Sequence, residues 1–418
     1  MTVQKVIIIG GGPAGLVLAH GLQKNGIPYE VYERDESPTS RSQGLALSLH
    51  WALPYIEKCM SPEHYKNITR ASVNPFDADN VTFVVIDGAS GETLIKHNNA
   101  APYPTALNTV TSKSYRVSRR RLRDFLEDGV EIHWKKRFKE YELTDDGVIV
   151  RFKDGSETKG DILVGADGAR SRVCDQLCGD KVQKNVLPFV FVAVTIPVNR
   201  EQYQQLYKIS STHGVVTGPN FGPEGNRAIF FSMLDIDEAN DQYKILIVMT
   251  WKNSSGEHGL PEDQASRVKL IKEIGALYCD PFKSIILGMN GDEVIWTTTI
   301  LEKLPSPWNN HGKVTLIGDS AHSMSMARGE GKNACYKLSR PSCLLYNHCL
   351  SKFSACNYAL RDAAELCDYL VEVNSGKLTA VQALGDYEDT MIKRSISAVL
   401  ASRDAIYSRH TPKNSVQN

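Results

Sequence analysis

Glycines and an acid near the N-terminus have the spacing of a phosphate-binding turn. Gly10, Gly12 and Gly15 follow the β-branched run Val6–Ile9, and a helical pattern begins directly after them. Glycine permits a tight turn and close approach of the backbone to a pyrophosphate, and the helix N-terminus adds a positive dipole. Glu33 ends the next strand-like run and can accept a hydrogen bond from a ribose hydroxyl. These residues predict a dinucleotide site that favours an unphosphorylated adenosine ribose.

Two later turns have a similar character, and each follows a short apolar run. The first is Gly165 to Arg172 (GADGARSR), and the second is Gly318 to His322 (GDSAH). Read with the N-terminal glycines, they resemble the single-component FAD-dependent aromatic hydroxylases. These are the p-hydroxybenzoate hydroxylase-like class A monooxygenases, and the fungal secondary-metabolism type fits best. The resemblance covers nearly the whole chain and implies FAD as the cofactor, with NADPH or NADH as a transient electron donor.

The resemblance also implies roles for individual residues. The first turn and Glu33 would hold the ADP half of FAD, and Asp167 and Gly168 would contribute to both FAD and NADPH binding. In the third turn, Asp319 would bond the ribityl chain, and the glycine-rich turn after it would lie against the pyrophosphate. The full set of predicted cofactor-binding residues is Gly10, Gly12, Gly15, Glu33, Arg34, Arg41, Gly44, Arg119, Asp167, Gly168, Asp319, Gly329 and Gly331.

Catalytic side chains are not predicted. Four residues of the second domain are candidates for the substrate pocket, but strand alternation alone does not decide whether they face it. They are His213, Arg227, Tyr243 and Trp251. His322 could act as an acid or base, but we favour a structural histidine near the flavin, because flavin performs the oxygen chemistry itself.

Two further patterns admit a competing interpretation. The run Arg116 to Arg123 contains five arginines, which could form a nucleic-acid or nuclear-localisation patch. We favour the solvated face of a helix with Ser118 as N-cap, in which only Arg119 is assigned to the cofactor. No metal site is predicted, because the cysteines and histidine of the C-terminal third lack a short paired loop. These residues are Cys335, Cys343, His348, Cys349 and Cys356.

The chain departs from its relatives at three places. Cys174 stands where the second motif commonly has an arginine, and Met326 stands where a proline is usual. The largest departure is an insert, residues 332–355, which separates the third turn from the helix that begins near Asn357. The insert is either a retained intron, since GGTAAG can encode Gly331-Lys332 and resembles a splice donor, or a genuine surface loop. If it displaces the helix from the pyrophosphate, FAD affinity should fall.

The elements that must position these turns define an α/β protein. We expect a Rossmann-like FAD-binding domain of the p-hydroxybenzoate hydroxylase type, a second β-sheet domain for the substrate, and a C-terminal helical segment. The expected boundaries are 1–72, 105–184 and 296–375 for the FAD-binding domain, 73–104 and 185–295 for the substrate domain, and 376–418 for a C-terminal helix and tail.

Hydrophobic periodicity supports these boundaries. Glu131 to Asp161 has the turn chemistry of a β-meander, and three strand-like runs form the second sheet. These runs are Phe189–Val198, Ala228–Leu234 and Tyr243–Trp251. Near the C-terminus, Leu360 to Val371 has a clear helical period, and the chain should fray after about Ser408.

Composition excludes several classes of protein. The chain has 48 basic and 48 acidic residues, so its net charge is zero and nothing global attracts nucleic acid. No apolar run approaches the roughly 20 residues that a bilayer span needs, and nine cysteines without CxxC spacing favour a reducing compartment. We therefore expect a cytoplasmic globular monomer or homodimer without a nucleic-acid partner.

The resemblance implies an NAD(P)H- and O2-dependent monooxygenase that hydroxylates or epoxidises a small hydrophobic or aromatic molecule through a flavin C4a-hydroperoxide. Its substrates would be of the kind found among phenolic polyketides or terpenoids. Two alternatives stay open: a flavoprotein remnant disabled by the insert, and an FAD-linked dehydrogenase that does not insert oxygen.

Overall fold

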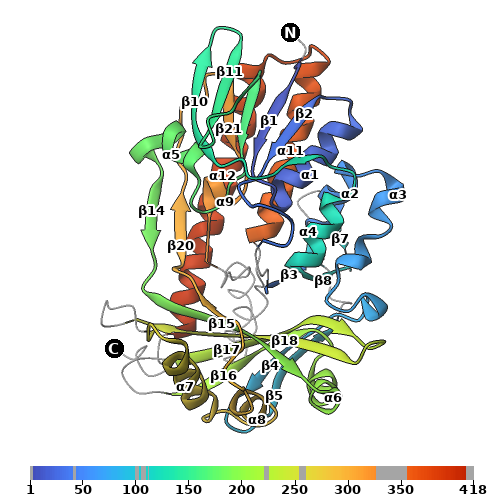
Figure 1. Cartoon of the computed structure of the whole chain (residues 1–418), viewed down its shortest axis with the longest axis vertical. Coiled ribbons are helices and arrows are strands. Elements are labelled where there is room, and N and C mark those ends of the chain that lie inside the picture. The colour runs from blue at the N-terminus through green and yellow to red at the C-terminus, as the bar shows by residue number, and fades with distance from the viewer. Residues whose placement is uncertain are drawn as a thin grey trace, which may run out of the picture.

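The computed structural model of the chain is built around two sheets (Figure 1). It describes residues 3–40, 44–98, 103–104, 110–111, 113–220, 226–253, 260–325 and 355–410. A parallel sheet with its helices forms the upper part of the view, and an antiparallel-rich sheet forms the lower part. Each sheet has its own buried hydrophobic cluster.

The parallel sheet has the strand order β21-β13-β1-β2-β9. Its strands run in the same direction, so the loops that follow their carboxyl ends meet along one edge. The fully buried run Val6–Ile9 forms β1 at the centre, because β-branched residues suit a strand covered on both faces. The other strands are β2 (Tyr29–Tyr32), β9 (Ile132–His133), β13 (Ile162–Gly165) and β21 (Val314–Leu316).

Helices and a meander cover the parallel sheet. Helix α1 (Pro13–Lys24) starts with proline in its first turn, ends at Asn25 as the sequence indicates, and packs against α11 (Ala355–Asn374). The antiparallel meander lies over the opposite part of the sheet, where Gly160 leaves room for Ile7. The meander strands are β10 (Phe138–Thr144), β11 (Gly147–Phe152) and β12 (Glu157–Gly160).

The second sheet has seven strands in the order β19-β15-β18-β17-β16-β4-β5. All neighbours are antiparallel except β16 and β4. The helices α6 (Arg200–Ile209), α7 (Gln264–Gly275) and α8 (Phe282–Leu287) contribute to its hydrophobic core and lie below it in Figure 1. The strands are β4 (Thr82–Asp87), β5 (Thr93–Asn98), β15 (Phe189–Val198), β16 (His213–Asn220), β17 (Asn226–Asp237), β18 (Gln242–Lys252) and β19 (Ile295–Thr297).

Several elements connect the two sheets. The ribbon of β3 (Ala46–Leu49) and β8 (Tyr115–Ser118) touches β17, and a second ribbon pairs β14 (Gln183–Val186) with β20 (Leu301–Leu304). Helix α12 (Ala380–His410) contacts both β20 and β17. The remaining helices and short strands are α2 (Leu53–Cys59), α3 (Pro62–Tyr65), α4 (Arg119–Glu127), α5 (Arg172–Cys178), α9 (Asp319–His322), β6 (Tyr103–Pro104) and β7 (Val110–Thr111).

The predicted fold class is confirmed, with differences in detail. The expected substrate domain included residues 73–104, which contain β4 and β5, but the sequence pattern did not identify β4, β5 or β16 as strands of the second sheet. The sequence predicts fraying after about Ser408, but helix α12 continues to His410. His410 is buried, and its Nε2 lies 3.1 Å from Thr250 Oγ1, so the second sheet anchors the end of α12. Ser118 does precede α4, but its side chain makes no capping hydrogen bond.

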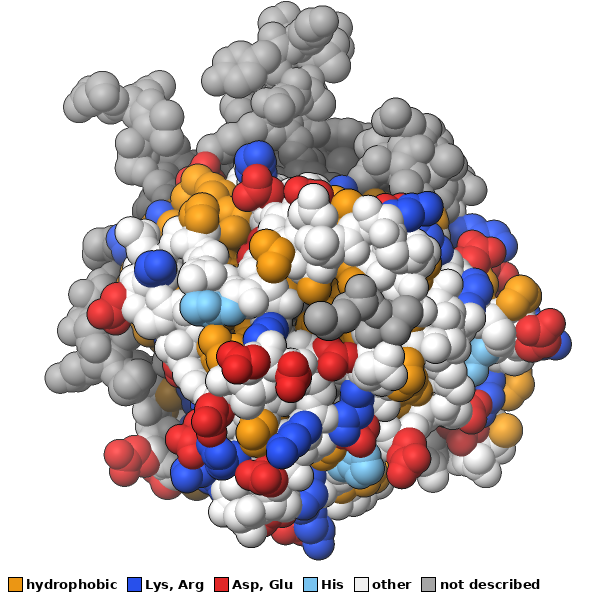
Figure 2. Space-filling view, turned by 90° about the horizontal axis from the view of Figure 1, so that it is seen from above, with side chains coloured by type: hydrophobic (Ala, Val, Ile, Leu, Met, Phe, Trp, Pro, Cys, Tyr) orange, Lys and Arg blue, Asp and Glu red, His pale blue; other side chains and the backbone are white. Residues whose placement is uncertain are grey.

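Surface charge is mixed on the face seen from above in Figure 2, where Lys and Arg side chains alternate with Asp and Glu. Among the described residues, no helix is both long and apolar enough to cross a membrane.

Candidate functional site

A cavity of about 580 Å³ lies at the carboxyl edge of the parallel sheet. Residues from the turns after β1, β13 and β21 line it together, so three segments far apart in sequence meet there. Eight predicted site residues lie on its wall: Gly10, Gly12, Glu33, Arg34, Arg119, Asp167, Gly168 and Asp319. Gly15 and Gly44 lie outside the lining, and Arg41, Gly329 and Gly331 are not among the described residues.

The glycines of the first turn serve different purposes. Gly10 has φ +122°, and a Cβ there would lie 2.3 Å from the Ala166 carbonyl oxygen. A Cβ on Gly15 would lie 2.2 Å from the Gly10 carbonyl oxygen. Gly12 has open space around it and lines the cavity directly before α1. Gly10 and Gly15 are therefore needed for packing, whereas Gly12 keeps the cavity open.

Glu33 is held by the backbone around it. Its Oε2 accepts a hydrogen bond of 2.9 Å from the Gly11 N–H, and its Oε1 accepts one of 3.0 Å from the Asp35 N–H. Each carboxylate oxygen can accept more than one hydrogen bond, so Glu33 keeps acceptor capacity toward the cavity. The carboxylate thus fixes the first turn and faces the cavity at once.

One carboxylate oxygen of Asp167 has no hydrogen-bond donor. Its Oδ2 accepts a 2.8 Å hydrogen bond from the Arg172 N–H, but its buried Oδ1 has no hydrogen-bond partner among the described atoms. Burial raises the pKa of this carboxyl group, against hydrogen bonds that lower it. A buried acceptor without a partner is costly, so this oxygen indicates a position where a ligand donor belongs.

Asp319 begins α9 at the end of β21, after Gly318. Gly318 has φ +60°, and a Cβ there would lie 2.7 Å from the Ala359 Cβ, so glycine lets α11 approach the turn. Burial raises the pKa of Asp319, and the charges of His322, Lys303 and Arg119 oppose that rise. The turn thus presents a third carboxyl group to the cavity, after those of Glu33 and Asp167.

The cavity rim is rich in basic side chains. Lys136 forms an ion pair of 2.8 Å with Asp154, while four arginines on the rim take part in no ion pair within the described part of the chain. These arginines are Arg34, Arg137, Arg170 and Arg172. Sequence reasoning assigned only Arg34, because the pairing of β9 beside β2, which brings Arg137 to the rim, was not apparent.

The five-arginine run is occupied by contacts within the chain. Arg119 begins α4 and lines the cavity, Leu122 is buried, and Arg121 pairs with Asp235. Arg116 is fully buried between the two sheets. The remaining members pair as Arg120–Asp124, Arg120–Asp235, Arg123–Glu127 and Arg123–Asp35. These contacts favour a structural helix over a nucleic-acid patch.

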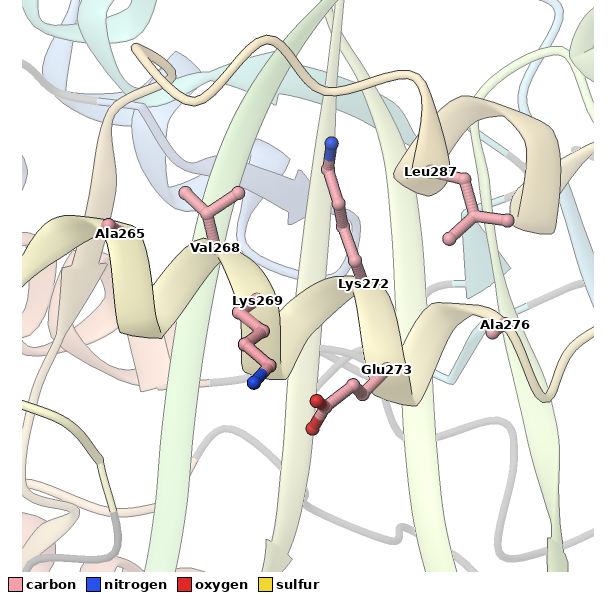
Figure 3. A pocket seen from close by; sticks show the side chains of 7 residues that line it. All are labelled: Ala265, Val268, Lys269, Lys272, Glu273, Ala276 and Leu287. Carbon is pink, nitrogen blue, oxygen red and sulfur yellow. The ribbon is translucent and has the colours of Figure 1, made fainter.

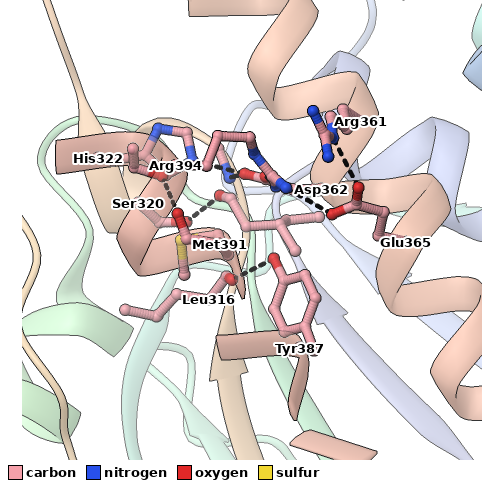
Figure 4. Close-up of polar contacts among 12 residues, drawn as sticks. Leu316, Ser320, His322, Arg361, Asp362, Glu365, Tyr387, Met391 and Arg394 are labelled. Carbon is pink, nitrogen blue, oxygen red and sulfur yellow. Dashed lines mark hydrogen bonds and ion pairs between the residues drawn. The ribbon is translucent and has the colours of Figure 1, made fainter. Parts of the chain in front are cut away.

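His322 belongs to a buried polar cluster behind the cavity (Figure 4). Its Nε2 lies 2.5 Å from Asp362 Oδ2, which also accepts a 2.9 Å hydrogen bond from the Gly318 N–H. Arg394 donates to Asp362 Oδ1 at 2.6 Å and to Glu365 Oε2 at 2.7 Å. Burial alone would raise the pKa of Asp362, but His322 and Arg394 bring it to about 2. The geometry agrees with a structural histidine.

The candidate substrate residues are dispersed. Tyr243 stacks on Tyr203 of α6, with ring centroids 4.5 Å apart, so it packs on the helical side of the sheet. His213 is fully buried on β16, and the Arg227 guanidinium lies 5.7 Å from the Trp251 ring centre. The structure does not bring these four residues to one point.

A second hollow of about 460 Å³ lies on α7 and α8 (Figure 3). It contains none of the predicted site residues, and Lys269, Lys272 and Glu273 stand along it. The described residues contain no group of three or more His, Cys, Asp or Glu side chains placed to hold a metal ion.

One of the sequence departures, the insert, concerns the site directly. Ala355, Cys356 and Ala359 line the cavity, so the helix after the insert begins at the site. Of the insert, only Ala355 is among the described residues, so Cys335, Cys343, His348 and Cys349 lie outside them. Met326, which precedes the insert, also lies outside the described residues.

Comparison with known proteins gives a consistent result. The FAD binding domain family model matches residues 3–50 and 119–337. The FAD-dependent monooxygenase dbaB of Emericella nidulans is 32% identical over 341 residues, covering 78% of this chain and 83% of that protein. A probable FAD-dependent monooxygenase of Arthroderma benhamiae is 29% identical and covers 97% of this chain and 91% of that protein.

A solved structure shares the fold. The crystal structure of Klebsiella pneumoniae HpxO complexed with FAD and uric acid has a TM-score of 0.72 and 19% identity. The similarity covers 98% of this chain and 90% of that chain.

Proposed function

Because this chain belongs to the FAD-binding domain family and is an FAD-dependent monooxygenase, we propose that it uses NADPH or NADH and O2 to insert one oxygen atom into a small hydrophobic or aromatic molecule. The reaction would be a hydroxylation or an epoxidation, and the substrate would resemble the phenolic or terpenoid compounds of fungal secondary metabolism. The observation that carries the proposal is the convergence of Gly12, Asp167 and Asp319 on one cavity.

The residues on the cavity wall fit FAD. Open space at Gly12, directly before α1, suits a pyrophosphate, because the N-terminal N–H groups of that helix point toward it. Glu33 would accept from the adenosine ribose, and Asp319 from the ribityl hydroxyls. The unmet Oδ1 of Asp167 offers an acceptor on the same wall. Arg119 supplies positive charge for the phosphates.

FAD, when bound, supplies the redox and oxygen-activating chemistry, and the chain supplies binding and orientation. The rim arginines Arg170 and Arg172 follow Asp167 and Gly168 directly, and they would attract the phosphates of the nicotinamide donor. Neither arginine forms an ion pair with a described acid, so binding there would require no internal pair to break.

The substrate would lie where the cavity meets the second sheet. Leu45 to Leu47 line the cavity, and Ser48 continues the same strand toward β17. There the Arg116 side chain donates to Ser48 Oγ and Ser232 Oγ at 3.0 Å each and lies 5.2 Å from the Phe230 ring centre. This fully buried contact holds β3 against β17, and the substrate would lie on the cavity side of β3, against Leu45 to Leu47.

The test is a purified full-length chain. We expect bound flavin in its absorbance spectrum, oxidation of NADPH or NADH that a phenolic substrate accelerates, and one heavy-isotope oxygen atom from labelled O2 in the product. Product without the label would instead establish a dehydrogenase. A chain that takes up no FAD after reconstitution would establish the inactive remnant.

A further inference from the structure

The buried indole N–H of Trp296 has no acceptor within the described part of the chain. Trp296 lies on β19, at one edge of the second sheet, and its Nε1 has no hydrogen-bond partner there. An indole nitrogen is a donor only, so its burial without an acceptor costs free energy that a ligand oxygen would restore. Thr298, two residues further along the chain, lines the cofactor cavity. The unused donor therefore lies next to the space that the proposed function gives to the substrate.

The register of the second sheet fixes the face to which Trp296 points. Trp296 pairs with Ala193 of β15, and paired residues point to the same face of a sheet. Phe191 and Thr195 share that face, because side chains two residues apart on a strand do so. The ring centroids of Phe191 and Trp296 are 5.3 Å apart. Ser232 of β17 lies on the same face and is bonded to β8, so this face is turned toward the parallel sheet, opposite α6, α7 and α8 (Figure 1).

Thr195 and Trp296 converge on one point beside the cavity wall. A Cβ on Gly44 would lie 2.8 Å from Thr195 Oγ1 and 3.9 Å from Trp296 Nε1. Gly44 directly precedes Leu45, which lines the cavity. A hydroxyl and an indole N–H thus meet where the cofactor cavity reaches the second sheet, and the glycine keeps a side chain out of that point.

The chemistry of the two donors selects the ligand group. Neither Thr195 nor Trp296 carries a charge, whereas a carboxylate or phosphate gains most from charged donors. An indole N–H cannot accept, so a ligand hydroxyl can bond to it only through its oxygen. The Phe191 ring beside Trp296 supplies an apolar wall that suits an aromatic ring. The best fit is a neutral carbonyl or phenolic oxygen on an aromatic molecule.

We infer that Trp296 and Thr195 bind an oxygen atom of the substrate. The Trp296 indole N–H donates to a carbonyl or phenolic oxygen, and the Thr195 hydroxyl donates to the same oxygen or to a neighbouring one. Polar groups placed at one end of an apolar site fix the orientation of a ligand. The pair therefore decides which carbon atom of the ring faces the cofactor. This inference rests on the proposed function, which puts the flavin in the adjoining cavity.

The test uses the full-length chain loaded with FAD and three probes of similar size: 1-naphthol, 1-tetralone and naphthalene. The first two carry an acceptor oxygen, and the third does not. Equilibrium dialysis should show that 1-naphthol and 1-tetralone bind about tenfold more tightly than naphthalene, as expected for one hydrogen bond. Equal affinities, or no binding of 1-naphthol, would overturn the inference.

Trp296→Phe removes the donor and keeps an aromatic ring. It should weaken the binding of 1-naphthol and 1-tetralone about tenfold and leave that of naphthalene unchanged. Trp308→Phe is the matched control, because the Trp308 Nε1 is also buried without a described partner, but Trp308 lies outside the cavity wall, in the hydrophobic cluster of the parallel sheet. Equal losses in the two variants would refute the assignment of the donor to Trp296.

A second substitution covers the case in which Trp296→Phe does not fold or takes up no FAD. Thr195→Val keeps the shape of the side chain and removes its hydroxyl, so it should weaken the two oxygen-bearing probes about threefold. Circular dichroism and flavin absorbance check each variant. If Thr195→Val binds all three probes as the wild type does, Thr195 is not a donor to the substrate and the inference fails.

Nuclear magnetic resonance observes the indole N–H itself. The chain has five tryptophans, so isotope-labelled indole nitrogens give five N–H resonances. The resonance missing from Trp296→Phe belongs to Trp296, and 1-naphthol and 1-tetralone should move it further downfield than naphthalene does, because only they supply an acceptor. A tryptophan with a purely structural role would respond alike to the three probes, and that result would contradict the inference.

Two outcomes separate this inference from the proposed function. If the wild type inserts labelled oxygen into a phenol but Trp296→Phe binds 1-naphthol as tightly as the wild type, the proposed function stands and the oxygen-binding site is refuted. If the affinities differ as expected but no product contains the label, the site stands and oxygen insertion is refuted.

Discussion

Two groups of acids lie near the carboxyl ends of the parallel strands, and they differ in how many of their oxygens have hydrogen-bond partners. Asp362, behind the cavity, accepts hydrogen bonds from Gly318, His322 and Arg394, and its pKa is lowered to about 2. On the cavity wall, Asp167 keeps a buried oxygen without a described partner, and burial raises its pKa and that of Asp319. Satisfied acids fix the fold, whereas acids with raised pKa values and unmet acceptors mark the place for a ligand.

The largest loss of stability should come from removing Asp362, whose oxygens are hydrogen-bonded. Asp362→Ala leaves the Gly318 N–H and one of the two bonded Arg394 nitrogens without an acceptor in the interior, while Arg394 keeps its bond to Glu365. We therefore expect a loss of about 3–5 kcal/mol of unfolding free energy. Urea denaturation at pH 7 measures this loss.

The pH dependence of the unfolding free energy also tests whether Asp362 is a paired, ionised acid in the folded chain. Because the folded pKa of Asp362 is about 2 and the unfolded value is about 4, its contribution is full above pH 4 and is lost as pH falls toward 2. The wild type should lose stability over that range more steeply than Asp362→Ala. Parallel curves for the two proteins would refute the assignment of Asp362 as the paired acid.

Substitution of two glycines of the first turn should have intermediate and unequal effects on stability. Gly10→Ala forces a Cβ to within 2.3 Å of the Ala166 carbonyl at a positive φ, so we expect a loss of about 2–4 kcal/mol. Gly12→Ala meets open space and should cost less than about 1 kcal/mol, yet raise the Kd for FAD about tenfold. Urea denaturation and FAD titration measure the two effects. Equal destabilisation by both substitutions would contradict the division between packing and ligand approach.

The smallest effect on stability should come from the cavity acid. Burial raises the folded pKa of Asp319, so its favourable contribution is present below the unfolded value near 4 and is lost as pH rises through the folded pKa. Asp319→Asn should therefore leave the FAD-free chain as stable as the wild type, or more stable, at pH 7. The same variant should bind FAD about tenfold more weakly, for one lost charge-assisted hydrogen bond. Flavin fluorescence titration and urea denaturation test both statements. A variant that is destabilised but keeps its FAD affinity would show that Asp319 supports the fold, as Asp362 does, and does not bind the ligand.

Sequence reasoning found the turns because their chemistry is local. A buried strand followed by a glycine turn is visible within ten residues, as at Val6–Gly15 and at Ile162–Gly168, where the turn also contains Asp167. It did not find the partner of His322, because Asp362 lies 40 residues away across the insert and no local pattern connects them. It also did not find that Arg137 reaches the rim, since this depends on β9 pairing with β2.

The sequence by itself determined that this chain would form a parallel sheet with glycine and acid turns at its strand ends, because strand and turn preferences act over a few residues. Only the tertiary structure decided that Gly12, Asp167 and Asp319 share one cavity, and that Gly10 and Gly15 are also required for close backbone packing. Such contacts depend on which strands pair and which helices cover them, and burial then sets the protonation of each group.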